Sequence, residues 1–406
     1  MSSLKVLRHL TASLLVAGAL LCLVAGVRAA EEKPAPKKAP QVEVVFCLDT
    51  TGSMGGLIEG AKQKIWAICN QIANGKPTPD LKVGLVAYRD RGDDYITKVF
   101  ELSDDLDTIH GEIKKFNAAG GGDHPESVNQ AVHDAVHKIK WSEDKKTLRI
   151  IFLVGDAPPH MDYKDDVKYP ETCKLAVGKD IIINTIQCGT HAETKKYWQE
   201  ICRLAEGSFV QIDQGGGPVV SIATPFDKDL AKINGDLNRT TLVYGSRSLQ
   251  AAGEAKKAVN ATLAPGVAAD RAAYFGYGAG GAGMMGGYGG GFAAGPSYDL
   301  LVNIKAKKVK LEELKKEELP PELQKLSLKD QKAHLEKLDK ERQELLQKAA
   351  DLAKKRTAYI AKKQAEGKKK GARDAFDSQV LDVLQRQARR VDLRYEAPRA
   401  PAPRKE

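Results

Sequence analysis

Strand-like and helix-like patterns alternate along the first half of the chain. Short, mostly apolar runs rich in β-branched residues lie at 42–48, 81–88, 97–102, 150–155, 181–187 and 208–212. Apolar residues spaced by three or four positions, typical of amphipathic helices, lie between them at 57–72, 106–116, 126–140 and 193–205. This alternation predicts an α/β fold: a doubly wound, mostly parallel sheet with helices on both faces, followed by a helical C-terminal region. A charged turn at 89–94 predicts that the second and third strands form a hairpin.

The pattern changes after residue 225. Ala- and Lys-rich runs predict a helical extension at 226–275, to which the sequence assigns no role. Ten glycines among the 16 residues from Gly276 to Gly291 predict a flexible linker at 276–297. Residues 298–396 predict a basic helical hairpin or coiled coil with solvated Lys and Arg, and Pro-rich 397–406 predicts a disordered tail. One apolar seam there is complete, but Arg342 and Arg356 interrupt the other.

The N-terminus has the features of a secretory signal peptide at 1–30. Lys5 and Arg8 precede an apolar stretch from Leu10 to Val27, and small residues follow it. A Pro/Lys-rich linker at 31–40 then leads to the first strand. We therefore expect an exported protein that is secreted, periplasmic or on the cell surface, with an uncleaved membrane anchor as the alternative.

Charge is concentrated at the C-terminal end. The net charge is +10, but residues 301–406 carry 29 Lys+Arg and 18 Asp+Glu, or +11, which leaves −1 for the rest. This basic region predicts contact with an anionic surface or self-association. Its lysines lack interleaved aromatic residues, so nucleic acid is not expected. Five cysteines outside the signal lack Cys-x-x-Cys spacing and predict buried thiols, with one bridge among Cys173, Cys188 and Cys202 left open.

Candidate chemistry begins where the first strand ends. Asp49, Thr51 and Ser53 alternate there, and Gly52 lets the chain turn sharply beneath them. One carboxylate and two hydroxyls can then face one point. Oxygen ligands suit a hard cation, so we expect Mg²⁺, with Mn²⁺ or Ca²⁺ as alternatives.

Three loops together resemble the von Willebrand factor A domain family and its metal-ion-dependent adhesion site. The loops are Asp49-x-Thr51-x-Ser53, the Gly-rich stretch 120–126 that contains Asp123, and the strand that ends in Asp156. The resemblance covers 41–225 and implies that Asp123 and Asp156 join the metal ligands. Integrin-type members have Thr where Asp123 stands here. Asp123 would be a third carboxylate around the cation and would give the site excess negative charge. Alternatively, Asp123 and Glu126 have capping-box spacing and cap a helix.

A rigid Pro-containing loop follows Asp156. Because it lies at the expected metal edge, His160 and Asp162 are candidates for a rim that faces the ligand.

The resemblance implies binding of a protein partner or cell-surface component through the metal face, as in adhesion. No nucleophile elbow is present and Ser53 is assigned to the metal, so we expect no enzyme. Two alternatives stay open. One is a metal-dependent hydrolase that uses the same cation or the pair His133 and His137, and the other is a structural scaffold without a functional metal.

Overall fold

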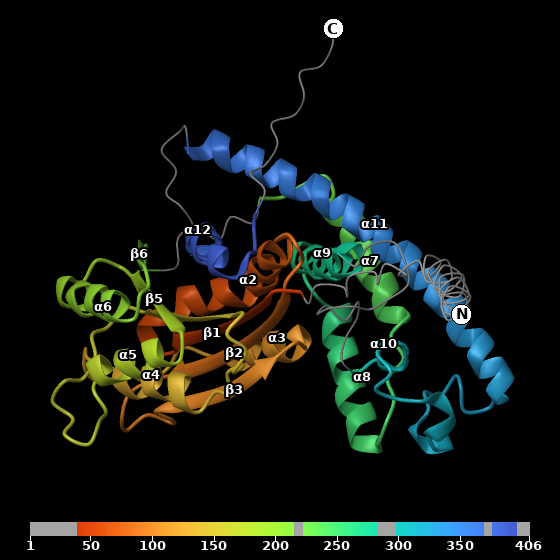
Figure 1. Cartoon of the computed structure of the whole chain (residues 1–406), viewed down its shortest axis with the longest axis horizontal. Helices are drawn as coiled ribbons and strands as arrows, with labels where there is room; N and C mark the ends of the chain where they lie inside the picture. Colours follow the sequence, from red (N-terminus) through yellow and green to blue (C-terminus); the bar gives the residue numbers. More distant parts are fainter. Residues whose placement is uncertain (1–38, 215–221, 282–297, 369–375, 396–406) are drawn as a thin grey trace, which may run out of the picture. The chain divides into compact units, whose positions relative to one another are not determined.

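The computed structural model describes residues 39–214, 222–281, 298–368 and 376–395. Six strands form one sheet, in the order β3-β2-β1-β4-β5-β6. All neighbouring pairs are parallel except β2 and β3, which are antiparallel as the charged turn predicts (Figure 1). The strands are β1 Gln41–Asp49, β2 Asp80–Tyr88, β3 Thr97–Ser103, β4 Thr147–Gly155, β5 Ile181–Cys188 and β6 Phe209–Ile212. The predicted fold class is confirmed.

Both faces of the sheet are buried. In β1, Val44 and Phe46 pack on one face, and Val45 and Cys47 pack on the other. This two-sided burial explains the continuous apolar runs of the central strands. The first face is covered by α2 (Gly55–Ala73) and α3 (Leu106–Lys115), and the second by α4 (Val128–His137), α5 (Tyr169–Gly178) and α6 (Ala192–Leu204).

The strand order reverses direction between β1 and β4. Chain connections leave these two strands toward opposite sides of the sheet, which opens a crevice beyond their carboxyl ends. Asp49 is the last residue of β1, and Asp156 directly follows β4. The topology therefore places the first and last candidate loops side by side.

The helices after residue 225 share the core of the sheet region. Residues of α7 (Asp227–Arg239), α9 (Pro265–Gly281), α11 (Leu328–Lys368) and α12 (Phe376–Gln387) belong to the apolar cluster that covers the first face. The other elements of this region are α8 (Arg247–Ala261), α10 (Leu300–Lys305) and short 3₁₀ turns at Leu311–Glu313, Lys316–Glu318 and Ala388–Val391. The described residues from 39 onward thus belong to one compact unit.

The predicted hairpin between the last two long helices is wrong. α11 packs on α7 and α9, whereas α12 packs on α2. Gln387, at the end of α12, exchanges two hydrogen bonds of 2.8 and 3.0 Å with buried Asn184 of β5. The partners of each helix are therefore distant in sequence, which helical periodicity could not indicate.

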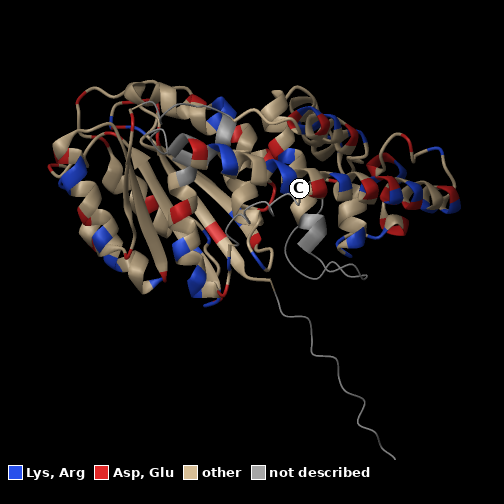
Figure 2. Cartoon of the chain, turned by 90° about the horizontal axis from the view of Figure 1, so that it is seen from above, with Lys and Arg blue, Asp and Glu red and all other residues tan. Residues whose placement is uncertain are grey.

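Two arginines predicted to be solvated are buried instead. Arg356 makes ion pairs of 2.7 Å with Asp227 and 2.5 Å with Asp270, and Arg342 lies 2.8 Å from Asp299. They interrupt the apolar seam because this face of α11 meets acidic residues of the preceding helices. Figure 2 shows few charges on the strands, but both signs intermixed on the helices at the right of the view.

The predicted linker begins too early, because α9 continues to Gly281. Buried Tyr277 donates or accepts a 2.9 Å hydrogen bond with Thr357 of α11. Gly276 lets the two helices approach: a Cβ there would lie 2.6 Å from the backbone nitrogen of Ala350. The glycines at the start of this segment therefore serve close helix packing, while 282–297 lie outside the described residues.

We expect Gly276→Ala to lower the free energy of unfolding by about 1–3 kcal/mol, because the added methyl meets backbone that cannot move alone. Gly235→Ala is the matched control in α7, where an added Cβ meets nothing within 4 Å. It should raise stability by about 0.5–1 kcal/mol through helix propensity. Urea unfolding measures both, and equal effects would contradict the packing argument.

Other predictions fall outside the described residues: the signal peptide 1–30, residues 31–38 of the linker, and the tail 397–406. Among the described helices, none has the length and apolar character needed to cross a bilayer. Cys47, Cys69, Cys173, Cys188 and Cys202 are buried free thiols, so the bridge left open by the sequence is not formed.

Candidate functional site

The loop after β1 arranges its oxygens around Asp49. Asp49 Oδ1 accepts hydrogen bonds from the backbone nitrogen of Thr51 at 2.9 Å and from Thr51 Oγ1 at 2.7 Å. Ser53 Oγ lies 3.4 Å from Thr51 Oγ1 and is exposed. Asp49 is fully buried, yet its Oδ2 has no hydrogen-bond partner among the described residues. One carboxylate oxygen is therefore free for another ligand.

Asp156 offers a second such oxygen. Its Oδ2 accepts a hydrogen bond from Gln214, while its Oδ1 is buried without a partner in the described chain. The hydroxyl of Thr194, in α6, donates to the backbone oxygen of Asp156 at 2.9 Å. These contacts fix the loop after β4 to α6 and to the residues after β6.

Glu126 supplies the third orphan oxygen, and sequence reasoning assigned it only to a helix cap. The capping interpretation is wrong, since α4 begins at Val128 and its N-cap residue is Ser127. Instead, the backbone of Glu126 bridges to the loop after β4: its nitrogen donates to Pro158 at 3.0 Å, and its oxygen accepts from His160 at 3.2 Å. Its side-chain Oε2 is buried and unpartnered among the described residues.

Crowding of these carboxylates changes their acidity. Burial, and then the charge of Asp156, raises the pKa of Asp49 to about 7, although hydrogen bonds from Thr51 oppose the shift. Burial and the charges of Asp49, Asp90, Asp93 and Asp156 raise the pKa of Glu126 to about 9. The protein thus holds together acids that repel one another, which is stable only if a proton or a cation neutralises them.

The Gly-rich loop closes over this cluster because its backbone takes conformations that favour glycine. Gly120 and Gly121 have φ of 78° and 82°. Gly120 accepts a 3.2 Å hydrogen bond from the nitrogen of Gly52, and a Cβ on Gly121 would lie 3.0 Å from Glu126 Oε1. The glycine run therefore permits close contact between the first and second loops.

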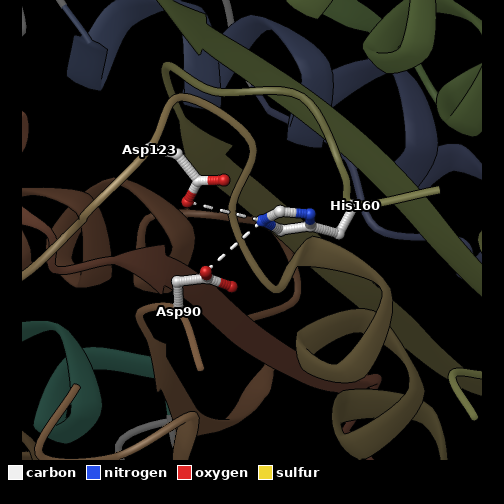
Figure 3. Close-up of side chains that lie close together, drawn as sticks. All are labelled: Asp90, Asp123 and His160. Atoms are coloured by element: carbon white, nitrogen blue, oxygen red, sulfur yellow. Dashed lines mark ion pairs between the residues drawn. The ribbon is translucent and has the colours of Figure 1, made fainter. Parts of the chain in front are cut away.

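Asp123 lies in a different group from the one predicted. Its side chain is 63% exposed, and its Oδ1 is 3.8 Å from Nε2 of His160, whose ring also faces Asp90 at 3.3 Å (Figure 3). The predicted rim residues do meet, since His160 Nδ1 lies 2.8 Å from Asp162 Oδ1. His160 itself is buried rather than solvent-facing. Asp90, Asp123 and His160 form a group that could hold a metal ion.

The oxygen-lined cluster fits a hard divalent cation. Asp49, Glu126 and Asp156 each keep one carboxylate oxygen without a hydrogen bond in the described structure. The hydroxyl of Thr51 lies beside Asp49, and that of Ser53 lies beside Thr51. Carboxylates and hydroxyls are the donors that Mg²⁺, Mn²⁺ and Ca²⁺ take. When bound, the cation would supply positive charge and open coordination positions.

The histidine pair of the hydrolase hypothesis has a different environment. The rings of His133 and His137 stack with centroids 4.4 Å apart. Asp134, which would have to activate a water, is fully buried. It accepts hydrogen bonds from Thr97 at 2.6 Å, Gln130 at 2.7 Å and Lys138 at 2.8 Å. Its oxygens are therefore engaged in holding α4 in place.

Comparison with known proteins agrees with this topology. Residues 43–220 match the family model of the von Willebrand factor A domain. Over these residues the sheet region is similar to a von Willebrand factor A domain. It carries the predicted first and last loops at the switch in strand order, and its second loop contributes Glu126 to them.

The relatives share this domain over short stretches. Human von Willebrand factor A domain-containing protein 7 is 33% identical over 120 residues, which is 30% of this chain and 12% of that protein. An ariadne-like RING finger protein of Acanthamoeba polyphaga mimivirus is 26% identical over 152 residues, or 37% of this chain and 14% of that protein. The chain thus spans about an eighth of the length of these relatives.

Solved structures resemble the chain over 43% of its length. One is the von Willebrand factor A domain of SpRpn10, at 16% identity, a TM-score of 0.34 and 89% coverage of that chain. Another is proximal thread matrix protein 1 from the mussel byssus with a zinc-occupied adhesion motif, at 18% identity, a TM-score of 0.35 and 42% coverage.

Proposed function

We propose that this chain is an exported binding protein whose von Willebrand factor A domain holds a divalent cation, Mg²⁺ first, and uses it to capture a protein partner. Asp49, Thr51, Ser53 and Asp156 would hold the cation together with Glu126. The observation that carries the proposal is the set of three buried, unpartnered carboxylate oxygens at the switch point. The relatives add support, because von Willebrand factor A domains generally mediate protein interactions.

The proposal assigns binding and no chemical step. The Thr51 hydroxyl lies beside Asp49 and the Ser53 hydroxyl beside Thr51, where both would serve the cation rather than a substrate. Three carboxylates around one divalent cation leave about one negative charge in excess. A basic or neutral partner group near the cation is therefore favoured over an acidic one.

Capture from an extract of the producing cell's surface tests the proposal. Partner proteins should bind the immobilised chain in Mg²⁺ and elute with EDTA. Ser53→Ala removes one exposed hydroxyl ligand and should weaken capture at least severalfold. Ser248→Ala, an exposed serine of α8, is the matched control and should capture like the wild type. Capture that is equal with Mg²⁺ and with EDTA would contradict the proposal.

A further inference from the structure

A second group of ligand atoms lies beside the oxygen-lined site and has different chemistry. Nε2 of His160 points at Asp90 Oδ2, 3.3 Å away, and at Asp123 Oδ1, 3.8 Å away (Figure 3). His160 is 4% exposed, and its Nε2 makes no hydrogen bond among the described residues. A buried nitrogen is thus aimed at two carboxylates without a partner of its own.

The surroundings of His160 fix the ring in this direction. Nδ1 lies 2.8 Å from Asp162 Oδ1 and can donate its proton there. The ring of His160 stacks on that of Tyr163 with centroids 4.0 Å apart. Arg91 contacts the Tyr163 ring by a cation–π interaction and forms an ion pair with Asp165 in the same loop. With Nδ1 protonated, a neutral ring presents the Nε2 lone pair to the two carboxylates. Three acceptors then face one point, which calls for a cation between them.

The donor set selects a class of cation. One imidazole nitrogen with two carboxylate oxygens suits zinc and related transition metals better than Mg²⁺, which takes oxygen ligands. Tetrahedral zinc with bonds of about 2.0 Å places its ligand atoms about 3.3 Å apart. The pair His160 and Asp90 already has this spacing. Exposed Asp123 needs only a small side-chain movement to reach it.

Outer contacts complete the arrangement. Asp90 accepts hydrogen bonds from Ser127 Oγ at 2.7 Å and from Tyr163 Oη at 3.0 Å, which hold its carboxylate in place. Asp162 orients His160 in the way that carboxylates commonly orient metal-binding histidines. We propose that Asp90, Asp123 and His160 bind a zinc-class transition-metal ion at a second site, distinct in its ligands from the Asp49 site, with solvent completing the coordination.

Titration of the metal-free full chain with ZnCl₂ in excess Mg²⁺ tests the proposal, because Mg²⁺ then occupies the oxygen-lined site. Calorimetry should show one zinc equivalent for the wild type. His160→Gln and Asp123→Asn should each weaken it at least about tenfold. Asp123 is exposed, so its variant should fold normally. Titration with Co²⁺ should give visible absorption bands that His160→Gln abolishes.

Control variants separate this site from other zinc binding. His133→Gln disrupts the stacked pair on α4, and His124→Gln removes the ring whose Nε2 lies 3.0 Å from Nδ1 of exposed His191. Both should keep the zinc equivalent, as should Asp49→Asn. The proposal is overturned if zinc binding survives both His160→Gln and Asp123→Asn, if Asp49→Asn alone removes it, or if the wild type binds no zinc.

Discussion

Asp49→Asn should abolish the stabilisation of this protein by Mg²⁺. A ligand that binds only the folded state raises its stability, by about 2.7 kcal/mol at a concentration of 100 Kd. In the wild type, saturating Mg²⁺ should therefore raise the melting temperature above its value in EDTA. The variant loses the buried Oδ2 ligand at the end of β1 and should melt at the same temperature in both. Differential scanning calorimetry measures the four midpoints.

The control is Asp134→Asn, a buried acid of α4 that is hydrogen-bonded to Thr97 and Lys138. It should melt at a lower temperature but keep the full Mg²⁺ shift. If the wild type itself shows equal midpoints in Mg²⁺ and EDTA, the domain is a scaffold without a functional metal.

The sign of the pH dependence in EDTA follows from the raised pKa of Asp49, which burial and Asp156 bring from 3.8 to about 7. The folded state holds this proton more tightly than the unfolded state. The contribution of Asp49 to the free energy of unfolding is therefore greatest below pH 4. It is lost as the pH rises toward 7. Asp49→Asn should flatten that loss, and Mg²⁺ should offset it in the wild type.

Arg271→Met should lower the free energy of unfolding by about 3–5 kcal/mol, because it leaves a buried carboxylate without its charge partner. Arg271 of α9 binds both oxygens of Asp107 in α3 at 2.8 Å and donates to Asn234 of α7 at 2.8 Å. Asn260 and Tyr298 also donate to Asp107, each at 3.0 Å. Three segments that follow residue 225 thus meet on one acid of the sheet region.

Urea unfolding of a double-mutant cycle measures this interaction. Asp107→Asn should lower the free energy of unfolding much less in the Arg271→Met background than in the wild type. The reason is that it removes the carboxylate charge that Arg271→Met leaves uncompensated. Arg239→Met is the matched control: Arg239 is exposed, and its ion pair with half-buried Asp236 should be worth about 0–1 kcal/mol. Additive effects of the two buried substitutions would show that the pair is not coupled.

The same pair has a pH signature. Burial alone would raise the pKa of Asp107, but the charge and hydrogen bonds of Arg271 outweigh it and lower the pKa. This contribution to stability is therefore present above the ordinary carboxyl range and is lost as the pH falls below it.

The sequence by itself determined the order of strands and helices in the sheet region, the β2–β3 hairpin, and the two loops that begin at Asp49 and Asp156. These features are local. Strand and helix periods depend on neighbouring residues, and in a parallel sheet the strand ends then share one edge. The residues of the first loop could therefore be proposed as a group before any contact was known.

Only the tertiary structure decided which acid of the second loop keeps a buried carboxylate oxygen without a partner, and how the described C-terminal helices pack. The backbone of Glu126 is held by hydrogen bonds with Pro158 and His160, more than 30 residues away, while local spacing favoured a helix cap. Arg271 and Asp107 are 164 positions apart, so no pattern along the chain could pair them. Burial and charge pairing depend on which distant segments pack together, and that information is absent from local periodicity.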